Sequence, residues 1–193
     1  SPWTSCGRRG RSGLDWGIEQ QLLRGRLLFG ATYYLNNYQN LITFDFLEGY
    51  VNIGRARSHG VEVFAEARPE EKLLFRASYT RTEAKDVDKN IPLLRRPRDK
   101  FTASFDYLFR QKWSFTLHLL YVGKRDDVDY SQWPYPQLTL PGYFLCHASA
   151  AFDFSPAVQF FARFDNIFNK KYEMVLGYGT YGFSSCSGVR IHF

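Results

Sequence analysis

Polar and apolar side chains alternate along most of this chain, and that period of two constrains its fold more than any other feature. Residues 101–109, for example, place Phe, Ala, Phe, Tyr and Phe on one face, with Thr, Ser, Asp and Leu between them. The alternation runs through residues 184–193 and ends on Phe193. Such an ending suits a strand that pairs within a β-barrel, where closure leaves no free edge.

Nine segments carry this alternation and are predicted to be strands. They are residues 14–23, 26–45, 50–68, 72–84, 98–110, 112–124, 141–154, 157–168 and 184–193. Short connections are predicted at 24–25, 69–71, 111 and 155–156, and longer ones at 46–49, 85–97, 125–140 and 169–183. Short turns at one end and long loops at the other are typical of outer-membrane barrels. The sequence therefore predicts an all-β, antiparallel transmembrane β-barrel.

Composition agrees with a barrel and argues against other classes. Aromatic residues make up 18% of the chain, yet no run of 18 apolar residues forms a transmembrane helix. The net charge is +6, with Arg and Lys scattered over strands and turns. This scatter favours anionic lipid headgroups over nucleic acid as the partner. A soluble β-sandwich is the alternative on composition alone, although it has no reason to alternate its loop lengths.

The number of strands predicts that the chain is part of something larger. Nine strands cannot close a bacterial single-chain barrel, because those barrels have even strand numbers. We therefore expect residues 14–193 to be the C-terminal part of a larger barrel. Residues 1–13 are rich in Arg and Gly and do not alternate, so they are predicted to be a loop, a linker or a truncation segment.

Several short motifs then resemble one known family. They are NIGRARSHGVE at 52–62, LLRRP at 93–97, LPGY at 140–143, RFDNIFNKKYE at 163–173 and GVRIHF at 188–193. In this order and spacing, they resemble motifs of TonB-dependent outer-membrane receptors, and LLRRP is similar to the cobalamin-receptor branch. One departure occurs at 181–183, where Tyr-Gly-Phe stands in place of the family's usual Pro-Gly-Arg.

The resemblance implies a 22-stranded barrel with an N-terminal plug, of which this chain supplies the last strands. It implies a receptor in the outer membrane of a Gram-negative bacterium, which takes up cobalamin or a ferric siderophore with energy delivered through TonB. Neither catalysis nor a cofactor is expected. Two alternatives stay open: a passive porin or adhesin barrel, and a barrel hydrolase with close Ser, His and Asp groups at one rim.

Aromatic residues of the long loops are candidates for contact with a bulky ligand. They are Trp133, Tyr135, Tyr178 and Tyr181. The alternative is an interfacial girdle, where Trp and Tyr rings anchor a barrel in its membrane. We favour the girdle for Tyr143, while the choice stays open for Trp133 and Tyr135.

A basic cluster and an acidic cluster lie in or beside the long loops. Arg95, Arg96 and Arg98 are candidates for binding lipopolysaccharide phosphates, with a solvated charge run as the equally weighted alternative. Asp126, Asp127 and Asp129 have the oxygen ligands that Ca²⁺ prefers. No glycine turn and bidentate Glu follow them, so solvated loop charges are the favoured interpretation.

The final strand is predicted to carry the signal that the barrel-assembly machinery recognises. Phe193 is the proposed signal, with Ile191 and Val189 as its apolar partners on the lipid face. Charged residues that alternate with the lipid-facing positions along each strand are expected to face the wet lumen, where they line the wall and brace the plug. They are Glu62, Glu66, Arg76, Arg163 and Asp165.

Overall fold

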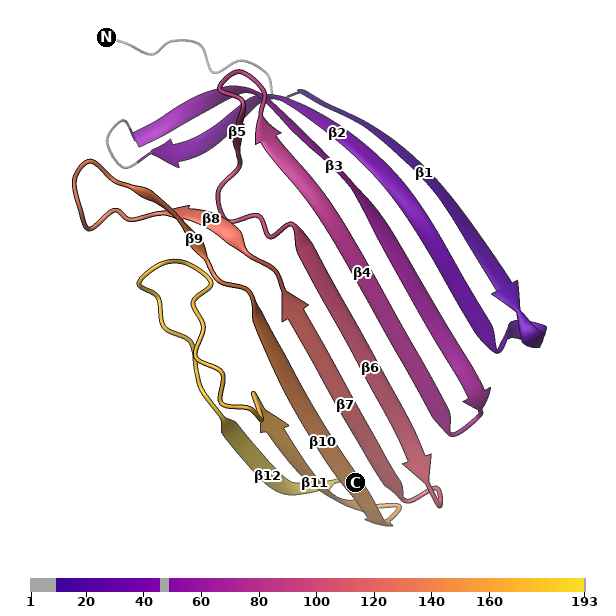
Figure 1. Cartoon of the computed structure of the whole chain (residues 1–193). Helices are drawn as coiled ribbons and strands as arrows, with labels where there is room; N and C mark the ends of the chain where they lie inside the picture. Colours follow the sequence, from indigo (N-terminus) through magenta and orange to yellow (C-terminus); the bar gives the residue numbers. More distant parts are fainter. Residues whose placement is uncertain (1–9, 46–48, 193) are drawn as a thin grey trace.

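The computed structural model describes residues 10–45 and 49–192, and it consists mainly of one antiparallel sheet (Figure 1). Its long strands are β1 (Gly10–Leu22), β2 (Leu27–Asp45), β3 (Gly49–Glu70), β4 (Leu73–Asp86), β6 (Asp99–Phe109), β7 (Trp113–Val122), β10 (Tyr143–Ser155), β11 (Val158–Asp165) and β12 (Ser184–Ile191). Each pairs with the next in this order, and the short β5 (Ile91–Pro92) adds to β4. All nine predicted strands are thus confirmed, and the structure shows that each long strand pairs with the next one along the chain.

Besides the short β5, three elements were not predicted, and several strand ends differ by a few residues from their predicted positions. A separate hairpin forms from β8 (Arg125–Val128) and β9 (Gln137–Leu140), and a 3-10 turn, η1 (Leu23–Gly25), joins β1 to β2. β1 begins at Gly10, so the predicted loop 1–13 is wrong at its C-terminal end. Gly10 pairs with Gln39 there, because the partner strand extends far enough to continue the ladder.

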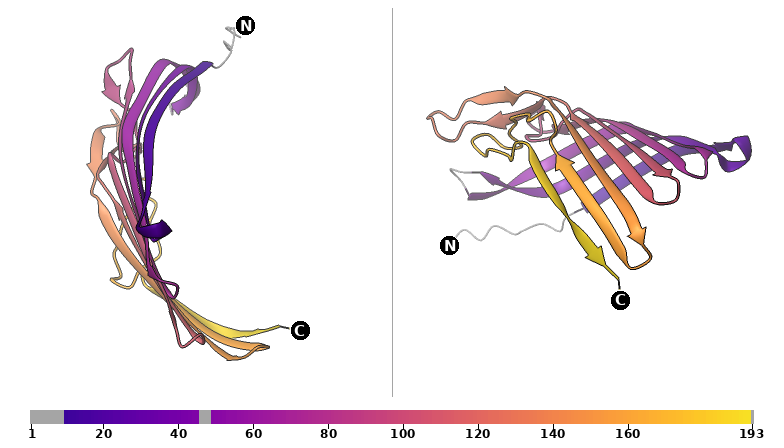
Figure 2. Two further views of the ribbon diagram at one scale, coloured as in Figure 1. Left: turned by 90° about the vertical axis from the view of Figure 1, so that its right-hand side faces the viewer. Right: turned by 90° about the horizontal axis from the view of Figure 1, so that it is seen from below.

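The sheet is strongly curved and resembles a section of a barrel wall (Figure 2). Among the described strands, β1 and β12 form its two margins, and each pairs on one side. The curvature follows from the right-handed twist of neighbouring strands, which accumulates across a wide sheet. Successive side chains of each strand therefore point alternately to the concave and to the convex side of the wall.

Short turns and long loops separate to opposite ends of the wall, with one exception. Short turns at 71–72, 110–112 and 156–157 lie at the end that carries η1. Connections at 87–98, 123–142 and 166–183 occupy the other, which we call the long-loop end. The predicted longer connection 46–49 is wrong, because the β2–β3 ladder continues to the pair Asp45–Gly49 and leaves only 46–48 between the strands. Residues 46–48 lie outside the described part.

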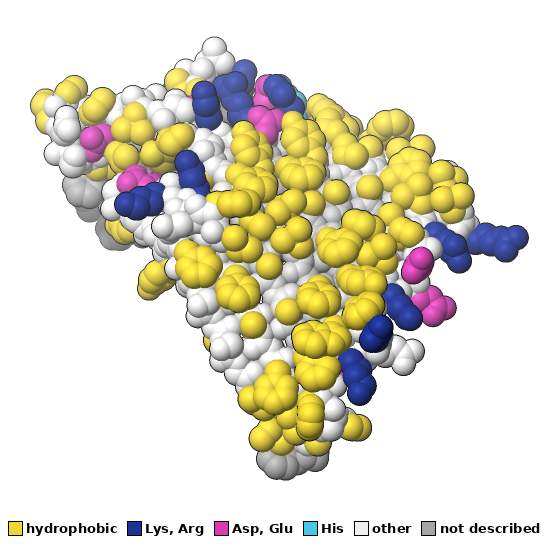
Figure 3. Space-filling model, turned by 60° about the horizontal axis from the view of Figure 1, so that its bottom comes forward, with side chains coloured by type: hydrophobic (Ala, Val, Ile, Leu, Met, Phe, Trp, Pro, Cys, Tyr) yellow, Lys and Arg dark blue, Asp and Glu magenta, His cyan; other side chains and the backbone are white. Residues whose placement is uncertain are grey.

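One face of the wall is apolar across every strand that crosses it. A single cross-strand row contains Phe75, Phe105, Leu117, Ala148 and Phe164. Figure 3 shows hydrophobic side chains over a broad face, with charged side chains gathered along its margins. Within the described residues, no helix is long and apolar enough to cross a membrane. An apolar surface of this extent on a sheet matches the lipid-facing side of a membrane β-barrel.

The opposite, inner face is polar. The row next to the apolar one, a single residue away along each strand, contains Glu66, Arg76, Ser104, His118 and His147. Two aromatic rings on this face pack against cross-strand glycines: a Cβ on Gly30 would sit 2.6 Å from a Phe64 ring carbon, and one on Gly188 would sit 2.9 Å from the Phe161 ring. The predicted alternation between faces is therefore confirmed.

Candidate functional site

The long-loop end holds the best-buried apolar cluster of the described residues. Val122, Tyr143 and Leu145 form it on the inner side, and the Tyr172 ring from the last loop packs against Tyr143 with a centroid distance of 4.2 Å. Tyr143 is only 6% exposed. Its predicted place in the interfacial girdle is therefore wrong, because it faces the loops rather than the lipid. Phe183, half exposed, instead stacks on the lipid-facing Phe164.

Asp127 joins three loops. Its side chain is fully buried, and it accepts hydrogen bonds from Arg95 Nε at 2.8 Å, from the Leu176 N–H at 2.9 Å and from the Val128 N–H at 2.9 Å. These donors come from the connections 87–98, 123–142 and 166–183. The interpretation of Asp127 as a solvated charge is therefore wrong, because the residue is an internal acceptor.

The pKa of Asp127 is set by two opposed effects. Burial favours the neutral acid and would raise the pKa, whereas the N–H groups of Leu176 and Val128 and the Arg95 guanidinium favour the carboxylate. The hydrogen bonds prevail, and the pKa lies below its ordinary value of 3.8. Asp127 is accordingly ionised at neutral pH and holds its donors as a charge-assisted acceptor.

Arg125 makes a second connection, from the same hairpin to the last loop. It donates from Nε to the Met174 carbonyl at 3.1 Å and from Nη2 to the Glu173 carbonyl. Its guanidinium lies 5.3 Å from the centre of the Tyr143 ring, a cation–π arrangement. Arg125 is buried, and its Nη1 has no hydrogen-bond partner among the described residues. We call Arg95, Arg125, Asp127 and the segment 173–176 the loop junction.

Asn166 shapes the last loop. Its side-chain amide donates to the carbonyls of Lys170 and Tyr181, while its Oδ1 accepts from the Lys170 N–H at 2.9 Å. Asn166 and Asn169 both have a positive φ, of 49° and 50°, which Asn tolerates better than most residues. Asn169 Oδ1 accepts from the Phe183 N–H and closes the loop. The NIFNKKY motif thus encodes a loop geometry, and its asparagines were the signal for it.

The predicted ligand-contacting aromatics lie on the long loops but form two groups. Trp133 and Tyr135 contact each other edge to face, with centroids 5.3 Å apart, and Tyr130 lies 5.8 Å from Tyr135. Tyr178 and Tyr181 make no ring contact with another described residue. Trp133, Tyr178 and Tyr181 are 74%, 73% and 94% exposed. These rings are therefore accessible to a ligand that approaches from the long-loop end.

The acidic cluster separates into residues with different partners. Asp126 accepts from the Thr139 hydroxyl at 2.9 Å, and Asp129 accepts from the Ser131 N–H and hydroxyl, which lower its pKa. With Asp127 in the loop junction, the three carboxylates serve three different contacts. Within residues 10–45 and 49–192, no group of three His, Cys, Asp or Glu side chains is placed to hold a metal ion.

The basic cluster also divides. Arg95 belongs to the loop junction, where its N–H additionally bonds the Asp126 carbonyl at 2.7 Å. Arg96 and Arg98 are exposed and line a cleft with Lys124. The structure thus separates Arg95 from the two other candidates for phosphate binding. Sequence reasoning missed Lys124, since it lies outside the Arg-rich segment.

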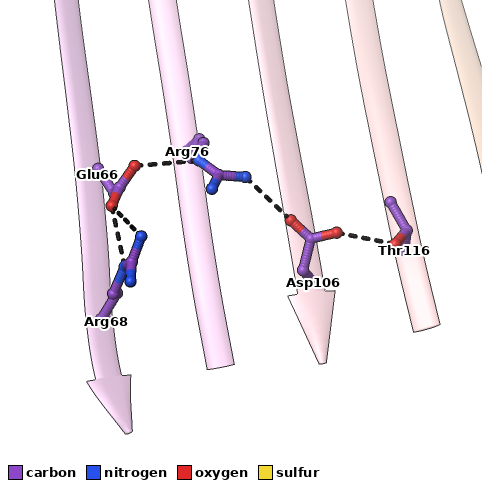
Figure 4. Close-up of polar contacts among 5 residues, drawn as sticks. All are labelled: Glu66, Arg68, Arg76, Asp106 and Thr116. Carbon is purple, nitrogen blue, oxygen red and sulfur yellow. Dashed lines mark hydrogen bonds and ion pairs between the residues drawn. The ribbon is translucent and has the colours of Figure 1, made fainter. Parts of the chain in front are cut away.

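The inner wall carries a ladder of charged and polar groups near the short-turn end (Figure 4). Glu66 pairs with Arg68 at 2.9 Å and with Arg76 at 3.0 Å. Arg76 reaches Asp106 at 3.4 Å, and the Thr116 hydroxyl donates to Asp106 at 2.8 Å. The predicted inward parity of Glu66 and Arg76 is confirmed, and these charges balance one another across three strands, with the Thr116 hydroxyl on a fourth.

A second inner group contains two histidines, His118 and His147. His147 Nδ1 lies 2.9 Å from Asp165 Oδ1, and Arg163 reaches the same carboxylate at 2.9 Å. The His118 and His147 rings are 5.9 Å apart. Among the described residues, no Ser or Thr hydroxyl hydrogen-bonds either imidazole, so the nucleophile contact that the hydrolase alternative requires is not formed.

The last strand places its apolar residues outward. Val189 lies opposite Phe160 and Ile191 opposite Val158, both on the lipid-facing side and both more than half exposed. The predicted lipid-facing parity is therefore confirmed for Val189 and Ile191. Phe193 lies outside the described residues.

A curved antiparallel wall with an apolar outer face, a polar inner face and long loops at one end defines part of an outer-membrane-type β-barrel. A family model described as "TonB dependent receptor-like, beta-barrel" matches residues 13–167. The chain belongs to this family, whose members are transport receptors of the Gram-negative outer membrane.

Solved structures of related receptors share the fold. The ferripyoverdine receptor of Pseudomonas aeruginosa is 18% identical, with a TM-score of 0.80 over 95% of this chain and 27% of its own. The ferric-catecholate import receptor Fiu of E. coli K12 is 20% identical, with a TM-score of 0.77 over 96% of this chain and 28% of its own. The ferric enterobactin receptor of P. aeruginosa is 18% identical, with a TM-score of 0.77 over 96% of this chain and 31% of its own. The chain thus spans under a third of these receptors.

Proposed function

We propose that the complete protein containing this chain takes up a scarce, bulky ligand across the outer membrane, with energy delivered through TonB to a plug inside the barrel. The observation that carries the proposal is the set of exposed aromatic rings on loops that the loop junction ties together. Trp133 extends from the hairpin that Asp127 and Arg125 anchor, and Tyr178 from the loop that they anchor. Rigid loops that present aromatic rings lower the entropic cost of capturing a large ligand.

The ligand we favour is a ferric siderophore, with cobalamin as the competing candidate. Three of the structurally similar receptors are named for iron complexes of pyoverdine, catecholates or enterobactin. Exposed cations accompany the aromatic rings on the long loops, among them Lys170 and Lys171. Aromatic faces and cations together complement an anionic iron chelate that carries planar rings.

Two further parts of the proposal concern assembly and energy supply. We assign recognition by the barrel-assembly machinery to the last strand, with Val189 and Ile191 on its lipid face, together with the residue Phe193 that follows it in the sequence. The charged inner wall would line the space that a plug fills, as expected for a wet lumen. A passive porin or adhesin is the competing class, and it needs neither TonB nor a plug.

Uptake assays with the complete gene product test the proposal. The gene is expressed in cells that lack other iron and cobalamin receptors, and radiolabelled ferric siderophore or cobalamin is supplied in separate assays. We expect saturable siderophore uptake that disappears in a TonB-deficient strain. Uptake that persists without TonB would identify a passive barrel. Uptake of cobalamin alone would show that the ligand is cobalamin and not a siderophore.

The aromatic contact has its own matched test. Trp133→Ala should weaken ligand binding about tenfold, as expected for the loss of one stacked ring. Trp16→Ala is the control, because Trp16 is similarly exposed, at 72% against 74%, but lies on the lipid-facing side of β1. An equal loss of ligand affinity in both variants would show that Trp133 does not contact the ligand.

A further inference from the structure

A cleft of about 610 Å³ opens at the long-loop end, where β4, β6 and β7 reach the rim. Its wall includes Glu83, Asp99 and Tyr121. Asp99 and Tyr121 lie in the cross-strand rows of the lipid-facing side, and Glu83 has the same parity on β4. These residues place one wall of the cleft on the outer surface, at the margin of the apolar face where lipid headgroups lie, while Thr82 and Ala84, which have the inner parity on β4, also line it. Figure 3 shows the charged side chains that border the apolar face at this margin.

The cleft carries an excess of unpaired positive charge. Four exposed cations line it: Lys85, Arg96, Arg98 and Lys124. None of the four is within ion-pair distance of a carboxylate in the part of the chain that the structure describes. Exposed cations gathered in one concavity raise the local concentration of anions.

The carboxylates of the same cleft already have partners. Glu83 lies 3.7 Å from His59. Asp99 accepts from the Tyr79 hydroxyl at 2.6 Å and lies 3.8 Å from Arg81. Asp126 accepts from Thr139. The acidic groups are thus engaged with neighbours at the edge of the cleft, which leaves the four cations available to an incoming anion.

A separate apolar furrow of about 440 Å³ lies further down the outer face. Small residues form its floor and larger ones its sides: Ala65, Ala67, Ala77 and Ala103 lie among Phe75, Phe105, Leu117 and Leu119. Ala103 follows Asp99 of the cleft by four residues on β6, a separation of roughly 13 Å along the strand. The furrow thus begins within the acyl region directly below the cleft.

We propose that the cleft and the furrow together bind one lipid with a phosphorylated headgroup from the outer leaflet, the class to which lipopolysaccharide belongs. The phosphate oxygens accept hydrogen bonds from Arg96, Arg98, Lys124 and Lys85, with the guanidinium groups suited to two-point contacts. One acyl chain lies in the furrow. The proposal rests on the membrane orientation of the family and not on the transported ligand, so it stands apart from the uptake proposal.

The headgroup contact is tested by native mass spectrometry of the complete gene product in detergent, titrated with lipid A, with its dephosphorylated form and with inorganic phosphate. Arg96→Glu/Arg98→Glu should reduce retention of lipid A about tenfold or more, from the loss of charge-assisted hydrogen bonds. Lys72→Glu/Lys112→Glu is the matched control, because both lysines are exposed at the opposite, short-turn end. Equal loss in the control, or equal retention of the dephosphorylated lipid, would overturn the proposal.

The acyl contact separates a lipid from a free anion. Ala103→Leu fills the furrow and should lower retention of lipid A several-fold without reducing binding of inorganic phosphate. Ala150→Leu is its control on the same lipid-facing side, outside the furrow. If inorganic phosphate competes with lipid A at equal concentration, or if Ala103→Leu has no effect, the site is an anion site alone and the lipid is excluded. Siderophore uptake, measured in parallel, reports on the uptake proposal independently.

Discussion

The strand wall and the loop junction occupy the same molecule but are stabilised in different ways. In the wall, neighbours pair in sequential order and each side chain faces lipid or lumen according to its parity. In the loop junction, one buried carboxylate joins residues 32 and 49 positions away along the chain. The wall therefore spreads its stability over many equivalent contacts, whereas the junction depends on a few atoms. Substitutions that distinguish these two modes provide the sharpest tests of the structure.

The largest expected effect is at the junction. Asp127→Ala removes the acceptor of the Leu176 and Val128 N–H groups and the partner of Arg95. Leaving such groups unsatisfied should cost about 2–5 kcal/mol of local stability. Hydrogen exchange of the complete gene product should then show faster exchange in 87–98 and 166–183, while β6 and β7 keep their protection.

Asp129→Ala is the control for that substitution. Asp129 also accepts hydrogen bonds, but only from Ser131 within its own turn. Its removal should leave exchange in the other two loops unchanged. If Asp127→Ala leaves loop exchange unchanged, or accelerates exchange throughout the wall, the junction is not the separate unit described above.

The next effect tests the two faces of the wall. Ala103→Arg places a charge on the lipid-facing side and should destabilise the protein by about 2–4 kcal/mol. Ser104→Arg, one residue further along β6, places the same charge on the wet inner face and should cost far less. Urea unfolding of the complete gene product from lipid bilayers measures both. Equal costs would contradict the assignment of faces.

A smaller effect is expected from pH. Because the pKa of Asp127 in the folded loops lies below its ordinary value of 3.8, the stabilisation is fully present above that value. It is lost as the pH falls through the lower, folded pKa, when the carboxylate gains a proton. The loss should be less than that of Asp127→Ala, since a protonated carboxyl still accepts hydrogen bonds. Protease cleavage of the loops, measured from pH 7 down to pH 2, should rise only at the acidic end, and Asp127→Asn should abolish that rise.

The smallest effect is expected in the lumen ladder. Arg76→Ala removes the ion pairs to Glu66 and Asp106, but all three side chains are partly exposed. Exposed ion pairs contribute about 0–1 kcal/mol, so the unfolding midpoint should hardly move. A loss as large as that of Ala103→Arg would show that the wall also depends on single polar contacts. Arg81→Ala is a comparison on the outer rim, where the pair with Asp99 is longer, at 3.8 Å.

Sequence reasoning was accurate where structure is local and inaccurate where contacts are distant. The alternation predicted nine strands and the facing of residues such as Val189 and Glu66, because side-chain direction in a strand follows from position alone. It did not predict β8 and β9, whose four-residue strands are too short to show a period. It also misjudged Tyr143 and Asp127, because burial at a loop base depends on which distant loop folds over it.

What the sequence by itself determined is the wall: its strands, its two faces and the end at which the long loops gather. A period of two needs no tertiary information, since each strand meets the same pair of environments. Only the tertiary structure decided the roles of the loop residues. It separated Arg95 from Arg96 and Arg98, and it buried one aspartate of three. The physical reason is that a loop side chain acquires its partner from another loop, through contacts that no local pattern records.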